Sequence, residues 1–283
     1  MARRKKLISE ARRGDAEAQY ALACDYDFEN PKDRRRAVYW YRKAAEQGHI
    51  QAQNSLGECL RDGEGVRKSR QQALRWFKMA AEQGHATAQV SLGYALFYGE
   101  SIRKDQVAAL NWYRKAARRG QNSAQFNIAQ MYRVGDVVAQ SWPQAIRWYL
   151  KAAKNGNVNA MHWLGRIYGG EEKYPEDPEK SAYWLQRAAE LGDVQSQCSL
   201  GVCYIRGLGV DRNQRLGAYW YRQAAKQGDE WACYLLGLCY RDGTGTPRNN
   251  GWAKYWFRKA AAKGETKAKE KLKELESKRA SPR

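Results

Sequence analysis

The segment Trp112-Tyr-Arg-Lys-Ala116-Ala117 decides the fold, because the chain contains seven versions of it. Their tryptophans follow one another at intervals of 36 residues and are Trp40, Trp76, Trp112, Trp148, Trp184, Trp220 and Trp256. A fixed period of this length is typical of a solenoid, in which each copy of a small structural repeat buries its apolar face against its neighbours. We therefore expect function to depend on an extended surface rather than on one catalytic pocket.

Each repeat is predicted to be a pair of helices. In the first helix, small and apolar residues recur at offsets of four and eight, as in Ala52, Leu56 and Leu60, which is typical of one helical face. Five repeats place a glycine at the same position inside this helix, namely Gly57, Gly93, Gly165, Gly201 and Gly237. Glycine in a helix interior costs about 1 kcal/mol relative to alanine. Its repetition predicts a notch into which the second helix packs.

The second helix is predicted to begin at a side chain that can accept hydrogen bonds from the free N–H groups of a first helical turn. These residues are Asp33, Ser69, Asp105, Ser141, Asp177, Asn213 and Asn249. The glycine that opens the next repeat, such as Gly84, is expected to cap the helix in the left-handed conformation. Because one tryptophan buries about 150–250 Å², the row of tryptophans is predicted to form the core of the stack.

These signals divide the chain into seven repeats between two polar caps. Residues 1–13 resemble a second helix with Lys6 in place of the tryptophan, and residues 264–283 resemble a first helix with Lys273 in place of the notch glycine. The predicted repeats are 14–47, 48–83, 84–119, 120–155, 156–191, 192–227 and 228–263.

The repeat resembles the Sel-one-like repeat family, a relative of the tetratricopeptide repeats. The resemblance rests on an Ala-Gln-x-x-Leu-Gly-x-x-Tyr first helix, a Gly-x-Gly-Val turn and a Trp-Tyr-x-Lys-Ala-Ala second helix, and it is clear at 84–119 and 192–227. It implies an all-α, right-handed superhelical solenoid of helix pairs. It also implies a role as an adaptor or scaffold for protein complexes, with no catalytic residue.

The cysteines indicate a reducing compartment. All six lie on predicted first helices; they are Cys24, Cys59, Cys198, Cys203, Cys233 and Cys239. The resemblance implies that secreted relatives join the two helices of one repeat by disulfides, which these positions do not allow. The basic N-terminus lacks the apolar stretch of a secretory signal, and no apolar run of about 18 residues occurs. We expect a cytoplasmic protein with buried thiols.

No enzyme, metal or cofactor site is predicted. His49 and His85 are expected to be surface residues of the turns between repeats. Ser101-x-x-Lys104 matches a motif of penicillin-recognising enzymes, but its companion motifs are absent, so the match is interpreted as chance. The net charge of +20 favours an acidic partner.

The candidate partner-binding residues form a stripe on the first helices. With the opening glycine as position 1, they occupy positions 4, 7, 8, 11 and 14. They are Tyr20, Tyr94, Phe97, Phe126, His162, Trp163, Arg166, Trp231, Tyr234 and Leu238. Since first helices usually line the concave side of such solenoids, we expect a groove that holds an acidic or aromatic-rich protein segment. Packing of these residues between adjacent first helices is the alternative.

The function predicted from this groove is that of a monomeric, non-enzymatic adaptor for a partner protein. One alternative is an immunity or inhibitor protein that neutralises an enzyme or toxin. Another is a basic protein associated with nucleic acid, although no nucleic-acid-binding motif is present.

Overall fold

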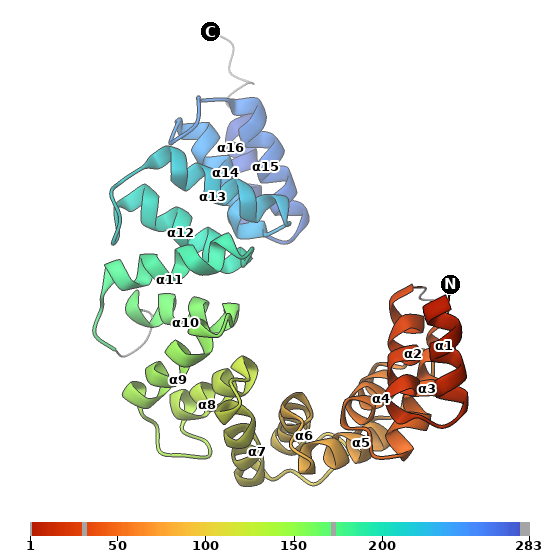
Figure 1. The fold of residues 1–283 in the computed structure, drawn as a ribbon. Helices are drawn as coiled ribbons and strands as arrows, with labels where there is room; N and C mark the ends of the chain where they lie inside the picture. Colours follow the sequence, from red (N-terminus) through yellow and green to blue (C-terminus); the bar gives the residue numbers. More distant parts are fainter. Residues whose placement is uncertain (1, 30–32, 171–173, 278–283) are drawn as a thin grey trace. The chain divides into compact units, whose positions relative to one another are not determined.

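The computed structural model describes residues 2–29, 33–170 and 174–277, which contain sixteen α-helices and no strand (Figure 1). The first helices of the seven pairs are α2 (Ala16–Glu29), α4 (Ile50–Asp62), α6 (Ala86–Tyr98), α8 (Asn122–Val134), α10 (Val158–Tyr168), α12 (Val194–Arg206) and α14 (Glu230–Asp242). The second helices are α3 (Arg34–Glu46), α5 (Arg70–Glu82), α7 (Gln106–Arg118), α9 (Trp142–Lys154), α11 (Pro178–Glu190), α13 (Gln214–Lys226) and α15 (Asn250–Ala262). The prediction of an all-α protein built from helix pairs is confirmed.

The chain forms two compact blocks, Met1–Asn155 and Gly156–Arg283. Within each block, every helix packs on the helices that precede and follow it in the chain. Helix α1 (Ala2–Arg12) packs on α2 in the N-terminal block, and α16 (Thr266–Ser277) packs on α15 in the C-terminal block.

The row of tryptophans does not form the centre of the core, contrary to the prediction. Trp256 is buried, whereas the other six tryptophans of the row are half-buried. The residue after each tryptophan is instead the buried one, at most 4 % exposed; these residues are Tyr41, Phe77, Tyr113, Tyr149, Leu185, Tyr221 and Phe257. Successive side chains on a helix point about 100° apart, so only one of two neighbouring aromatic residues can face the first helix directly.

The glycine notch is confirmed, and the buried residue of the second helix fills it. A Cβ atom on Gly93 would lie 2.7 Å from Cε1 of Tyr113, and one on Gly57 would lie 2.6 Å from Cε1 of Phe77. In the fifth repeat, a Cβ atom on Gly165 would lie 2.6 Å from Cδ2 of Leu185. These distances are shorter than carbon atoms tolerate, so the missing side chain lets the two helices of a pair approach each other.

The predicted caps are present in all but one second helix. Asp105 Oδ1 accepts a hydrogen bond from the N–H of Ala108 at 2.9 Å, and the equivalent bond forms in five further repeats. Asp33 is the exception, because its side chain accepts no such bond and lies 3.5 Å from the Arg36 guanidinium. The eight glycines that open repeats or the C-terminal cap all have positive φ, for example 93° at Gly84, as predicted.

Buried glutamines connect consecutive repeats. Gln53 Nε2 donates to the carbonyl of Ala45 at the end of α3 (3.2 Å), and its Oε1 accepts from Gln83 Nε2 after α5 (2.8 Å). Gln19, Gln125 and Gln197 make the same pair of bonds with their own neighbours. One side chain thus joins the ends of two second helices through the first helix between them, and we name this arrangement the glutamine clamp.

We predict that Gly93→Ala destabilises the protein by about 1–3 kcal/mol, because the new Cβ overpacks the Tyr113 ring. Helix propensity alone would instead stabilise this variant by about 1 kcal/mol. Urea-induced unfolding, monitored by circular dichroism, shows whether the free energy of unfolding falls or rises. The control is Ala129→Gly, at the notch position of a repeat that carries alanine, which should lose about 1 kcal/mol by propensity. A more stable Gly93→Ala variant would contradict the packing.

We predict that Gln53→Met lowers the unfolding free energy by about 1–2 kcal/mol. Methionine occupies the same position in the fifth repeat as Met161, so the volume is retained while both hydrogen bonds are lost. Gln51→Met, at an exposed site of the same helix, should change stability by less than about 0.5 kcal/mol. Equal midpoints of urea unfolding for the two variants would show that the clamp does not stabilise the stack.

Candidate partner-binding surface

Several residues of the predicted stripe contribute to packing within or between repeats. Tyr20 on α2 stacks on His49 with ring centroids 4.6 Å apart, and burial raises its pKa to about 12. His162 Nδ1 lies 2.9 Å from Ser196 Oγ, which joins α10 to the next first helix, α12. Tyr234 is buried against Phe257, and Leu238 packs against the same cluster.

Other residues of the stripe line a pocket in the N-terminal block. The pocket has a volume of about 360 Å³ and lies between α6, α7 and α8. Its residues are Phe97, Tyr98, Tyr113, Phe126, Asn127, Gln130, Met131, Arg133, Val134 and Asp136. The two predicted members are Phe97 and Phe126, both half-buried. We name this space the α6–α8 pocket.

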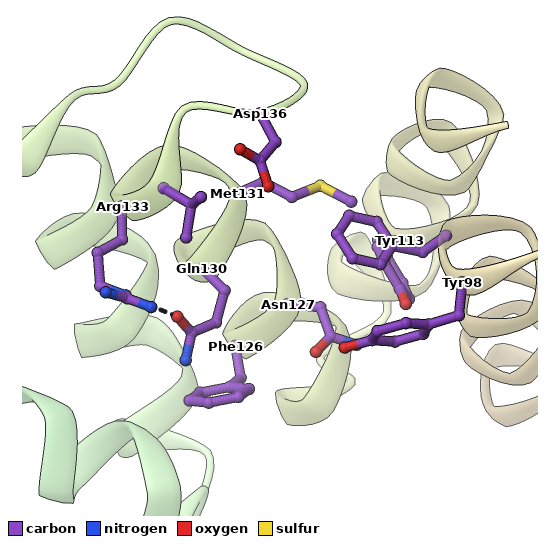
Figure 2. Close-up of a pocket in the computed structure, with 10 residues that line it drawn as sticks. Tyr98, Tyr113, Phe126, Asn127, Gln130, Met131, Arg133 and Asp136 are labelled. Carbon is purple, nitrogen blue, oxygen red and sulfur yellow. Dashed lines mark hydrogen bonds between the residues drawn. The ribbon is translucent and has the colours of Figure 1, made fainter. Parts of the chain in front are cut away.

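The α6–α8 pocket combines aromatic walls with a polar rim. Figure 2 shows Tyr98 and Tyr113 reaching toward Asn127 of α8, with Gln130 and Arg133 further along the same helix. Arg133 Nε donates to Gln130 Oε1 at 2.8 Å. Burial raises the pKa of the Tyr113 hydroxyl, and a hydrogen bond from Asn127 opposes that shift. The pocket therefore offers both apolar contact and amide groups.

A second pocket lies one repeat earlier, on the other side of α6. It has a volume of about 340 Å³, and Phe77, the ring that fills the preceding glycine notch, is part of its wall. Tyr94 lines this pocket, and its ring centroid lies 4.5 Å from that of Tyr98. Tyr94 is 46 % exposed and Tyr98 is 59 % exposed. An exposed pair of tyrosines thus separates two neighbouring pockets on one face.

In the C-terminal block the predicted residues are dispersed. Arg166 lines a pocket of about 230 Å³ between α10, α11 and α12, and its guanidinium lies 4.6 Å from the half-buried Trp163 ring. Trp231 is 39 % exposed and lies 5.2 Å from the Tyr234 ring. These residues do not form one site with a shared pocket.

Three further residues of the α6–α8 pocket could have been predicted from the sequence. Asn127, Gln130 and Arg133 occupy positions 8, 11 and 14 of their repeat, which belong to the predicted stripe, but the selection kept mainly aromatic side chains. Tyr98 and Met131 occupy positions 15 and 12, outside the stripe. Their place in the wall depends on how two repeats pack.

The prediction that His49 and His85 are surface turn residues was wrong. Both are half-buried N-caps of first helices, with Nδ1 accepting from the N–H of Ala52 and Ala88, each at 3.2 Å. Burial, together with the charge of Arg119, lowers the pKa of His85. The sequence contained a signal for this N-cap role, because other repeats carry aspartate or asparagine at the same position, such as Asn157 and Asp193.

The six cysteines are free thiols, and five of them are buried. Burial raises the pKa of Cys59, Cys198 and Cys239 to about 12, which keeps these thiols protonated. Among the described residues, no three His, Cys, Asp or Glu side chains are grouped so that they could hold a metal ion. No helix in the same ranges has both the length and the apolar character needed to cross a bilayer.

Ser101 has a conformational role in its turn. Its φ of 60° is the only positive value for a non-glycine residue in the described part of the chain. Other repeats place Gly65, Gly209 and Gly245 at this position with φ of 68–69°. Ser101 therefore adopts the left-handed conformation that the turn requires.

We predict that Ser101→Gly stabilises the protein by about 0.5–1 kcal/mol, because glycine adopts positive φ without the steric cost that a Cβ imposes. The reverse change, Gly245→Ser, should destabilise by about 2 kcal/mol or more, since its Cβ would collide with the Gln214 carbonyl. Thermal unfolding of both variants compares the two sites. A loss of stability in Ser101→Gly would show that the side chain contributes a contact that offsets its strain.

The comparisons with known proteins agree on one family. The profile of the Sel1 repeat matches the chain seven times, at residues 16–49, 50–85, 86–121, 122–157, 158–193, 194–229 and 232–265. No curated protein matches the chain.

Solved structures give the same result. The protective antigen c5321 of uropathogenic Escherichia coli, which has an SLR fold, is 32% identical over 96% of this chain, with a TM-score of 0.88. This chain spans 58% of that protein's length. A Sel1 repeat protein from Oxalobacter formigenes is 29% identical over 86% of this chain and 96% of its own, with a TM-score of 0.72. The immunity protein PA5088 from Pseudomonas aeruginosa, at 19% identity over 75% of this chain and 80% of its own and a TM-score of 0.49, is too distant to carry information on function.

Proposed function

The chain belongs to the Sel1 repeat family, and on that premise we propose that it is a non-enzymatic adaptor that binds a segment of another protein on its first helices. The binding surface we assign is the exposed Tyr94 and Tyr98 pair on α6 together with the pocket on either side of it. We name this surface the α6 groove.

The exposure of two adjacent tyrosines is the observation that carries the proposal. Interaction surfaces are enriched in tyrosine, tryptophan and arginine, and such residues contribute most of the binding free energy when they line pockets. Tyr94 and Tyr98 meet both conditions, because each is exposed and each lines a pocket. Tyr39, which is 53 % exposed on the second helix α3, lines neither pocket.

The chemistry of the groove favours a segment that carries large apolar or aromatic side chains. Phe97, Phe126 and Met131 provide apolar walls, while Asn127 and Gln130 add amide groups to the lining of the α6–α8 pocket. First helices of adjacent repeats are expected to lie about 8–10 Å apart. A segment in the polyproline II conformation rises about 9 Å over three residues and returns to the same face at every third residue, so residues i and i+3 of one segment would enter neighbouring pockets.

We further propose that the adaptor is a cytoplasmic monomer. The support is the set of free, mostly buried thiols, since proteins of oxidising compartments more often form disulfides. The net charge of +20 favours acidic partners and opposes self-association.

The test begins with affinity capture on the wild-type protein and identification of the partner by mass spectrometry. Binding of the purified partner is then measured by calorimetry for Tyr98→Ala and for Tyr39→Ala. We predict that Tyr98→Ala weakens binding by about tenfold or more, which corresponds to about 1.4 kcal/mol. Tyr39→Ala removes an equally exposed tyrosine outside the groove and should change the dissociation constant by less than about twofold.

An unchanged dissociation constant for Tyr98→Ala and for Tyr94→Ala would overturn the assignment of the α6 groove. Because both side chains are on the surface, about half exposed or more, neither variant should lose its fold, and circular dichroism checks this. A partner enzyme whose activity falls on binding would indicate the inhibitor function instead of an adaptor.

A further inference from the structure

A concentration of basic side chains lies on the second helices of the third and fourth repeats. Residues 106–155 contain eight basic side chains and only one acidic side chain, Asp136. Seven of the eight belong to α7, to its C-cap or to α9, and all seven are exposed: Arg114, Lys115, Arg118, Arg119, Arg147, Lys151 and Lys154. We name these seven residues the basic face.

Within the described part of the chain, the cations of the basic face lack carboxylate partners. Across the described residues, none of the seven lies within 4.0 Å of an Asp or Glu oxygen, whereas Lys78 on the preceding second helix lies 3.8 Å from Glu82. Two of the ammonium groups instead lie over indole rings, Lys115 at 3.9 Å from Trp112 and Lys151 at 4.5 Å from Trp148. Their charge is therefore available to a partner.

The repeat itself shows that the fold does not require this charge. The residue after the paired alanines is Glu46, Glu82 and Glu190 in the first, second and fifth repeats, but Arg118, Lys154 and Lys226 in the third, fourth and sixth, and Ala262 in the seventh. A cation in the last turn of a helix interacts favourably with the helix dipole. Three repeats nevertheless end this helix with glutamate and one ends it with alanine, so the fold does not require a cation here, and the third and fourth repeats are the only neighbouring pair that carries one.

The basic face is separate from the α6 groove. Lys115 follows Tyr113, a wall of the α6–α8 pocket, by two residues. At about 100° per residue, its side chain leaves α7 roughly 200° away from that of Tyr113. The pocket and the basic face thus lie on opposite sides of the same helix.

We propose that the basic face is a second docking surface, which binds an acidic segment of a protein partner. Carboxylates of an Asp- or Glu-rich segment complement a row of exposed ammonium and guanidinium groups along α7 and α9. Each helix is 13 residues long, or about 20 Å, a length that about six residues of extended chain would span. This surface acts through long-range attraction, and salt weakens its binding.

A protein segment fits this face better than a nucleic acid does. Binding of single strands relies on aromatic rings that stack on bases, but Trp112 and Trp148 are half-buried beneath lysines. No aromatic side chain of α7 or α9 is among the exposed large apolar residues. The face presents charges without a stacking platform.

The test uses a fluorescent 20-residue poly-L-glutamate peptide as the probe and fluorescence anisotropy as the readout, at about 50 mM and about 300 mM NaCl. Arg118→Glu/Lys154→Glu introduces at both positions the glutamate that the first, second and fifth repeats carry there. The matched control is Arg187→Glu/Lys226→Glu, which makes the same change in net charge on second helices of the C-terminal block. We expect about tenfold weaker binding for the first pair and less than about twofold for the control.

Three results would overturn the proposal. In the first, the wild type does not bind the peptide at low salt, and in the second, the two pairs of substitutions weaken peptide binding equally. In the third, Arg118→Glu/Lys154→Glu loses binding to a 20-base-pair DNA duplex but keeps its binding to the peptide. If the glutamate pair unfolds, Arg118→Gln/Lys154→Gln, which keeps helix formers without reversed charge, should still weaken binding several-fold. Tyr98→Ala should leave binding of the probe unchanged, so failure of the α6 groove and failure of the basic face are told apart.

Discussion

The contact between a first-helix glycine and the buried residue of its second helix sets the geometry of the protein. At Gly93 the missing side chain leaves space that the Tyr113 ring fills, and the same pairing recurs from Gly57 with Phe77 to Gly237 with Phe257. The glycine costs about 1 kcal/mol of helix propensity, and close packing of a large ring offsets that cost. Phe77 and Tyr113 also form walls of the two pockets beside α6, so the contact that closes the second and third helix pairs also shapes the candidate binding surface.

The joints between pairs add polar contacts to the apolar packing that runs from repeat to repeat. A left-handed glycine ends each second helix, and the glutamine clamp ties that end to the next pair. The third repeat lacks the second bond of the glutamine clamp, because Arg119 stands where the repeats with a complete clamp carry the residue that donates to the buried glutamine. In the described chain, Gln89 Oε1 therefore has no hydrogen-bond partner. Since packing and clamps involve a fixed set of positions, the outer positions of each repeat are free to vary. The α6 groove and the basic face are two products of that freedom.

Periodicity was sufficient to predict the helix pairs, the notch and the glycine caps, because each of these depends on residues within one repeat or at its border. It was insufficient to decide which of two adjacent aromatic residues lies in the core. Trp112 and Tyr113 are one position apart, and composition favours the larger, less polar tryptophan. The structure buries the tyrosine because it faces the notch. The α6–α8 pocket was harder still, since Tyr98 and Met131 become neighbours only when α6 and α8 pack around α7. Side chains that meet across repeats leave no periodic signal.

The most direct test of the notch is a double-mutant cycle between Gly93→Ala and Tyr113→Ala, measured by urea-induced unfolding. If the ring occupies the notch, alanine at position 93 is unfavourable beside Tyr113 and becomes favourable once the ring is removed. The account predicts a coupling free energy of about 1–3 kcal/mol between the two sites. Additive effects within about 0.5 kcal/mol would contradict it, because they would mean that the glycine and the ring do not share the space on which the helix pair depends.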